Sequence, residues 1–497
     1  MPISQGSHVT QLTAALVFLI LMGIFRLIFV RRAQDPFGVF LLCFGVFYGF
    51  RAVLIASGLD TPLPSYLFAT SDMDVVYTRT VLGLCLFLVA FMGAAYLVTR
   101  HPARSPGLLF SPHPTNVKRL VIVGFALTGV ALVTQSYLLA RFGSFANVIH
   151  ASKVDKALAG EHYLMLPGEL AALCCTAAYL ELRHRLGPKT SLRFVMLGCA
   201  VLNSVLVFAW GARSFLVIIV AMLILVSGPI REPRQQRRQG IAGVVRVVLA
   251  AVLVLSMAVF LRTTRDSLVR PGGTDSFAQQ GTFRQASQAV NGNYFDASML
   301  AFRDWPANHQ FRNGKDFVNG FLDVVPKKVW PGKPSPFAPQ FRQYYEPHTV
   351  NGWPVGAPTT WYLDFGWFGL LIGGLISGAV IGEVARRYAA APWSGVNTAL
   401  TFTLGAFVLQ TGWGGQTPQN IVAVFLPVAI MLRIFVTRTT TRKRHGETRM
   451  APRRSPVDAA VGGGHFEPGV STRTPPSWDL DVGSGLSGSS PRGEGDT

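Results

Sequence analysis

Cations and carboxylates accumulate in one long polar segment of this chain, between about residues 261 and 361. Arginine and lysine side chains can bind phosphate oxygens, and a carboxylate within reach of a hydroxyl group can accept its proton. The cations would suit recognition of an anionic lipid-linked substrate, because guanidinium groups make bidentate hydrogen bonds to phosphate oxygens. A solvated basic surface would have the same composition, so charge alone leaves both interpretations open.

The cations of interest include one arginine outside the long segment. Arg213 lies in the short Gly211–Ser214 connection between two apolar runs, where a cation close to hydrocarbon indicates either a functional role or snorkelling to the interface. Arg262 and Arg265 share a helical face with Asp266 and could form a binding site, although an ordinary intrahelical ion pair would give the same pattern. Arg51 could line the same site. The candidate phosphate- or glycan-binding cations are Arg213, Arg262, Arg265, Lys327, Lys328 and Lys333.

Carboxylates on the same segment could remove the proton from an attacking hydroxyl group. Asp266, Glu346 and Asp364 are the candidate catalytic residues, with Asp323 and His348 as further options, and the residues do not choose among them. Aromatic side chains accompany them. Trp330 and Trp361 could stack on sugar rings, although anchoring at the level of lipid headgroups is the commoner role for such tryptophans.

The elements that must position these residues are apolar. Half of the 497 residues are hydrophobic and only 14% are charged, which excludes an ordinary soluble enzyme. Apolar runs long enough to cross the hydrocarbon core recur about eleven times. We therefore predict an all-α polytopic membrane protein with one large extracytoplasmic loop at 261–361. The predicted spans are 11–30, 37–57, 80–98, 120–140, 163–180, 194–210, 214–230, 244–260, 362–384, 397–413 and 420–436.

The distribution of Lys and Arg predicts the orientation of these spans. Alternate short connections are strongly basic, which places the N-terminus outside and the C-terminus in the cytoplasm. The first run lacks cleavage-site features and is predicted to be retained as a span. Most of the net charge of +20 lies in the predicted cytoplasmic connections and in the tail, where membrane orientation and contact with anionic lipid explain it. We therefore expect no nucleic-acid partner.

The C-terminal end differs sharply in composition from the apolar part. After residue 436 the chain becomes rich in Arg, Pro, Gly and Ser, which predicts a transmembrane domain at 1–436 and a disordered basic cytoplasmic tail at 437–497. All five cysteines fall within predicted spans and none has metal-ligand spacing. We expect no metal site and no cofactor.

Two stretches of the long loop resemble a known family. Phe317–Pro334 reads FVNGFLDVVPKKVWPGKP, and Gly356–Gly369 reads GAPTTWYLDFGWFG. They are similar to the bacterial O-antigen polymerases (Wzy-type) and oligosaccharide repeat-unit polymerases, in which the second stretch re-enters the membrane and ends in an FGxxG element. The Gly211–Ser214 turn resembles the family's arginine-bearing turn, and the likeness covers about residues 11–436.

The resemblance implies a GT-C-like, metal-independent membrane glycosyltransferase of the bacterial plasma membrane. Such an enzyme polymerises oligosaccharide repeat units linked to polyprenyl diphosphate, at the outer face, into a surface polysaccharide or exopolysaccharide. Arg213, Arg265, Lys327 and Lys328 would then stabilise the departing polyprenyl diphosphate. The implied partners are lipid-linked oligosaccharides and the bilayer, with a chain-length regulator and a flippase as further candidates.

Three alternatives stay open. An O-antigen ligase is consistent with His309 and His348 in the loop. Another polyprenyl-linked glycosyltransferase could hold a divalent cation at Asp72-Met73-Asp74, although ordinary solvated acids are the commoner explanation. A transporter or flippase for lipid-linked glycans would need ionisable groups near the membrane midplane, and no acidic proton relay is evident there. The main internal polar residues are Arg26, Gln135, Asn203 and Gln410.

Overall fold

The computed structural model describes most of the chain between residues 7 and 410. The described ranges are 7–25, 36–103 without 63 and 70, 105, 110, 115–153, 164–186, 191–208, scattered positions between 219 and 260, 293–322, 325, 329–332, 337–348, 352–353, 355–391 and 393–410, with Ile430. The chain divides into two compact units, Met1–Thr441 and Arg442–Thr497. The predicted disordered tail at 437–497 lies outside the described residues.

Within the described residues every regular element is a helix, which confirms the all-α prediction. Three helices are long and apolar enough to cross a membrane: α4 (Met73–Thr99), α5 (Val117–Phe142) and α16 (Ala357–Ala390). Shorter apolar helices occupy Val9–Met22, Gly45–Ala56 and Ser191–Val207. The apolar helices support a membrane protein, but the described part of the chain has three such long helices and not about eleven. Most residues of the predicted spans 214–230, 244–260 and 420–436 lie outside it.

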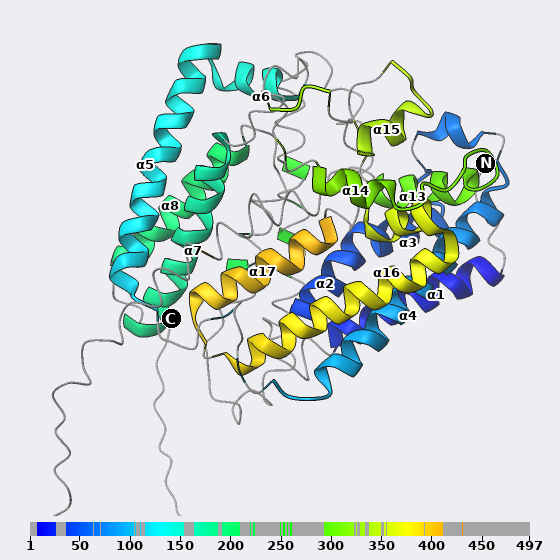
Figure 1. Ribbon diagram of the computed structural model, residues 1–497, viewed down its shortest axis with the longest axis horizontal. Coiled ribbons are helices and arrows are strands. Elements are labelled where there is room, and N and C mark those ends of the chain that lie inside the picture. Colours follow the sequence, from blue (N-terminus) through cyan, green and yellow to red (C-terminus); the bar gives the residue numbers. More distant parts are fainter. Residues whose placement is uncertain are drawn as a thin grey trace, which may run out of the picture. The chain divides into compact units, whose positions relative to one another are not determined.

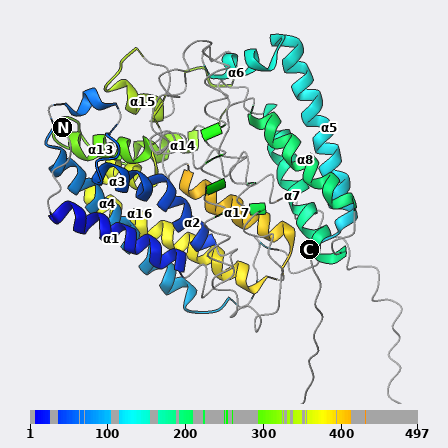
Figure 2. The same cartoon turned by 180° about the vertical axis from the view of Figure 1, so that it is seen from behind.

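One group of helices is built around α4 and α16, which lie side by side along their lengths (Figure 1). α1 (Ser7–Phe25) packs against α4, and α2 (Pro36–Phe44) packs against α1 and α16. A π-helical turn at Gly45–Gly49 joins α2 to α3 (Phe50–Ala56), so the second predicted span is an interrupted helix. Figure 2 shows α1 and α2 on the face turned away in Figure 1.

Small residues explain the close approach of α16 to α4. Gly374, Gly378 and Gly382 recur every four residues and therefore form one stripe along α16. A Cβ atom at Gly378 would lie 2.1 Å from the backbone oxygen of Phe91. Glycine stripes of this kind let membrane helices pack backbone against backbone. Such close van der Waals packing holds helices together in lipid, where no hydrophobic driving force acts between them.

A second group contains α5, α7 (Leu166–Leu186) and α8 (Ser191–Phe208), which pack pairwise against one another (Figure 1). α7 is buried on all sides from Ala171 to Ala178, as expected for a helix at the centre of a bundle. α17 (Gly395–Gln410) packs against both α7 and α2 and so connects the two groups. At its start the N–H of Gly395 donates a hydrogen bond to Glu181 Oε1 at 3.0 Å.

The second half of the segment predicted as a loop is a folded helical block. It contains α13 (Asn293–Asp304), α14 (Lys315–Leu322) and α15 (Phe337–Gln343). The helix expected at 295–305 is present, but it is not a surface helix, because Phe295, Met299 and Phe302 are fully buried and α13 packs against α4 and α16. The other expected helix, at 284–290, lies outside the described residues.

Candidate functional site

The candidate site that the structure describes best is a break in α16. At Gly366 the backbone leaves the helical conformation, with φ +63° and ψ −148°, in the left-handed region that glycine adopts most readily. A break leaves carbonyl groups before it without their partners one turn later. The N–H of Arg312 instead donates to the Leu363 carbonyl at 2.9 Å, and the N–H of Asn313 donates to the Asp364 carbonyl at 3.1 Å.

The side chain of Asp364 is held at this break by the same turn. Gly314 N–H donates to Asp364 Oδ1 at 3.0 Å, so consecutive amides of residues 312–314 fix both the backbone and the carboxyl group. Asn313 and Gly314 both have positive φ, 51° and 81°, which turns these amides toward α16. Asp364 is fully buried and its Oδ2 accepts no hydrogen bond. A buried acceptor without a partner is costly, and Oδ2 is therefore the carboxylate oxygen at this break that a donor could still bind.

An ion pair fixes the turn that caps the break. Arg312 Nε donates to both carboxylate oxygens of Asp316 at 2.8 and 2.9 Å, and Arg312 also donates to Gln340 Oε1 at 2.9 Å. Burial raises the pKa of Asp316, and the pairing with Arg312 lowers it, with a net rise above its ordinary value. The guanidinium group of Arg312 therefore joins the turn, α14 and α15.

Aromatic rings pack around the break. Trp361 lies 4.5 Å from Phe317 between ring centroids, and its ring lies directly over Gly373, where a Cβ atom would come within 2.3 Å. Trp361 is 7% exposed, so it serves as packing around Asp364 and not as an exposed sugar platform or a headgroup anchor. Trp330, in contrast, is 37% exposed on its turn.

Glu346 belongs to a polar network with Tyr66 and Arg342, which does not include Asp364. It accepts hydrogen bonds from the Tyr66 hydroxyl and from Arg342 Nε, the latter at 2.7 Å. Burial raises the pKa of Glu346, but these bonds outweigh it and hold the pKa below its ordinary value. A carboxylate that is already paired and weakly basic is less suited to accept a proton than Asp364.

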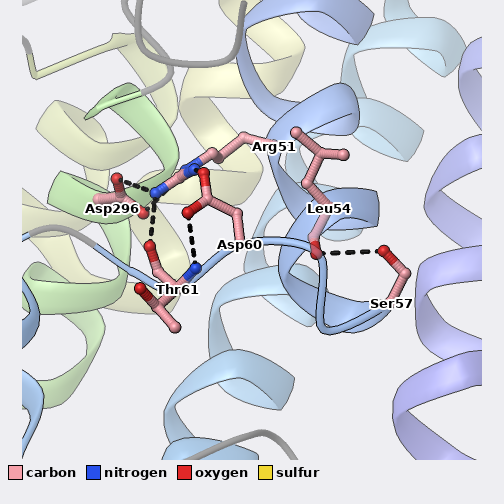
Figure 3. Close-up of polar contacts among 6 residues, drawn as sticks. All are labelled: Arg51, Leu54, Ser57, Asp60, Thr61 and Asp296. Carbon is pink, nitrogen blue, oxygen red and sulfur yellow. Dashed lines mark hydrogen bonds and ion pairs between the residues drawn. The ribbon is translucent and has the colours of Figure 1, made fainter. Parts of the chain in front are cut away.

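Arg51 is a buried cation that is surrounded by carboxylate and carbonyl oxygens (Figure 3). It forms an ion pair with Asp60 and donates to Asp296 through Nε at 3.3 Å and Nη2 at 3.1 Å. Nη2 also donates to the Thr61 carbonyl at 2.8 Å. Both carboxylates therefore bind the guanidinium group, and these contacts link α3 and the turn after it to α13.

Several predicted site residues cannot be related to this geometry, because they lie outside the described residues. They are Arg213, Arg262, Arg265, Asp266, Asp323, Lys327, Lys328 and Lys333. Of the two histidines that keep a ligase open, His348 is exposed, whereas His309 packs against the rings of Trp305 and Tyr344, at centroid distances of 4.5 and 4.6 Å.

The Asp72-Met73-Asp74 motif has a local structural role. Asp72 is the N-cap of α4, and its Oδ1 accepts from the N–H groups of Asp74 and Val75 at 3.2 and 3.3 Å. This is the ordinary bonding of an aspartate that begins a helix. Within the part of the chain that the structure describes, no group of three or more His, Cys, Asp or Glu side chains could hold a metal ion.

A buried carboxyl group that was not among the predicted site residues lies inside a predicted span. Glu169, in the first turn of α7, is 5% exposed, and its Oε2 is buried without a hydrogen-bond partner. Gln135 Nε2 on α5 and Asn203 Oδ1 on α8 are also buried without partners. A glutamate within residues 163–180, flanked by apolar residues, was the signal that could have identified it.

Comparison with known proteins yields no match of any kind: no family model fits the chain, and neither a curated protein nor a solved structure matches it.

Proposed function

We propose that this protein is an oligosaccharide repeat-unit polymerase that extends a glycan carried on polyprenyl diphosphate. The observation that carries the proposal is the carboxyl group of Asp364, which is held through Oδ1 at a helix break while Oδ2 accepts no hydrogen bond. It immediately precedes the FGxxG element, Phe365–Gly369, that motivated the resemblance. A preorganised carboxylate with one available oxygen in a water-poor site has the properties of a general base for a sugar hydroxyl group.

The reaction would transfer the glycan to that hydroxyl group. Asp364 Oδ2 accepts the hydroxyl proton as the oxygen bonds to the anomeric carbon, and the bond from that carbon to the diphosphate breaks with its electron pair leaving on the diphosphate. Arg213, Arg265, Lys327 and Lys328 are the proposed cations that stabilise the leaving group. Because Asp364 is fully buried, a hydroxyl group reaches it only when part of the packing around it opens.

The proposal includes a topology. About eleven spans would place the segment 261–361 outside the plasma membrane of a bacterium, with the N-terminus outside and the basic tail in the cytoplasm. The break in α16 would then mark the return of the chain from the external block into the membrane. A chain-length regulator and a flippase would be the protein partners.

Glycan chain length in a deletion strain tests the proposal. Wild type should restore a ladder of polymer lengths, whereas Asp364→Asn and Arg213→Ala should leave single repeat units on the carrier. Asp72→Asn is the matched control, since Asp72 is an exposed helix cap and asparagine caps equally well. An unchanged ladder in the deletion strain would contradict the proposal, provided that no second polymerase is present. A restored ladder in Asp364→Asn would exclude Asp364 as the base.

Transport of lipid-linked glycans is the second candidate, and the buried carboxyl group of Glu169 favours it. An ionisable group inside a membrane bundle often takes part in proton relay or substrate passage. Glu169→Gln should then abolish passage of the lipid-linked unit to the outer face, measured by accessibility of the glycan on intact spheroplasts. If Glu169→Gln loses polymer but leaves that accessibility unchanged, the transporter assignment is wrong.

A further inference from the structure

Tyr344 presents an aromatic face next to the Asp364 site. Its side chain is 44% exposed, and its ring packs edge-on against buried Trp305 with a centroid distance of 5.4 Å and an interplanar angle of 88°. His309 lies beside it at 4.6 Å with an interplanar angle of 47°. Tyr344 and His309, which we call the Tyr344 platform, are thus two adjoining rings of which one is substantially exposed.

The platform is held rigidly from below. Trp305 is 1% exposed, its indole N–H donates to the Gln310 carbonyl at 3.1 Å, and its own carbonyl accepts from the Tyr362 hydroxyl at 2.8 Å. The Tyr344 hydroxyl accepts from Arg312 Nη1 at 3.3 Å. A ring that is fixed before binding loses little conformational entropy when a ligand stacks on it.

Polar groups lie around the rings, as recognition of a sugar requires. Arg312 carries charged donors beside Tyr344, and Asn308 is an exposed amide next to His309. Aromatic faces pack against the C–H faces of a pyranose, while such polar groups bind its hydroxyl groups. The platform is also close to the reacting position, since the backbone N–H of Arg312 binds the Leu363 carbonyl, one residue before Asp364.

We propose that the Tyr344 platform is a glycan subsite on which one sugar ring of the substrate stacks. This inference rests on the proposed function and adds the substrate contact. The subsite holds the glycan next to the helix break, so that the hydroxyl group to be extended stays near Asp364 over successive additions.

Saturation-transfer NMR of the purified full chain in detergent tests the subsite, with oligosaccharide fragments of the host's own surface polysaccharide as the probe. Wild type should transfer saturation to sugar ring protons. Tyr344→Ala should weaken binding about threefold to tenfold, the range expected for losing one aromatic contact. Tyr344→Phe should keep the signal, because it retains the ring, and Tyr137→Ala, which removes a 54% exposed tyrosine from α5, should match wild type.

The polymer ladder separates failure of the subsite from failure of the polymerase assignment. Tyr344→Ala should shift the ladder to shorter chains, whereas Asp364→Asn should abolish the ladder and keep the sugar signal. Binding in Tyr344→Ala equal to wild type, or no binding by wild type, would overturn the subsite. The two proposals can also fail separately. If sugar binding depends on Tyr344 but deletion of the gene leaves the polymer unchanged, the subsite stands and the polymerase assignment is wrong.

Discussion

The backbone N–H of Asn313 donates a hydrogen bond to the carbonyl oxygen of Asp364 at 3.1 Å, across 50 or so intervening residues. This bond replaces one that the helix loses at Gly366, so the turn before α14 caps the broken helix α16 at the residue that carries the candidate base. The position of the Asp364 carboxyl group therefore depends on the turn formed by residues 312–314. Substitutions in that turn should reduce activity more than they reduce the stability of the fold.

Gly314 tests this dependence. Gly314→Ala places a Cβ atom 3.2 Å from the Phe365 ring at a φ of 81°, which should cost about 1–2 kcal/mol and displace the N–H that binds Asp364. We expect loss of the polymer ladder with the protein still folded. Gly143→Ala is the control, since Gly143 also has a φ of 81° but faces open space at the end of α5. Equal activity of the two variants would contradict a role for the turn.

The glycine stripe on α16 should determine the packing of α16 on α4. Gly378→Ala would bring a Cβ atom to 2.1 Å from the Phe91 backbone oxygen, and the helices could separate only at a cost of about 1–3 kcal/mol or more. Thermal unfolding of the detergent-solubilised protein should show the loss. Gly93→Ala on α4 has no atom within 4 Å of the new Cβ and should be neutral or slightly stabilising. A similar change in both variants would show that the stripe is not a packing surface.

The buried ion network of Arg51 should contribute strongly to stability. Arg51→Met removes the donor that Asp60 and Asp296 share, and loss of one partner from a buried pair typically costs about 3–5 kcal/mol. Asp60→Asn should cost less, because Arg51 keeps Asp296 and asparagine keeps an acceptor. Comparison of thermal unfolding and expression level in the two variants measures this difference. A larger loss of stability in Asp60→Asn than in Arg51→Met would show that Arg51 is not the centre of the network.

Acid sensitivity should depend partly on Asp304. Burial raises the pKa of Asp304, but hydrogen bonds from Arg303 and Tyr345 outweigh it and hold the pKa below the ordinary value of 3.8. The stability it contributes is present above that value and is lost as the pH falls through the lower folded-state pKa. Asp304→Asn should therefore be less stable near neutrality and should flatten the fall in unfolding temperature below about pH 4. An acid profile parallel to wild type would show that other groups account for the loss.

The amino-acid sequence by itself determined the helical class and the membrane character of the protein. Apolar runs of membrane-spanning length and the shortage of charge are local properties, and they predict helices whatever their partners are. The sequence also identified Asp364 as a candidate, through the FG element beside it. The glycines every four residues at 374–382 were visible as well, but their helix partner α4 was not.

Only the tertiary structure decided which charged and aromatic residues are available for chemistry. Arg51 and Asp296 are 245 positions apart, and nothing in the sequence indicated that their charges neutralise each other in the interior. The same holds for Trp361, which is buried against Gly373, and for Tyr344, which is exposed beside His309. Pairing, burial and exposure depend on contacts between distant segments, and the free energy of an ionisable or aromatic group depends on those contacts more than on its sequence neighbours.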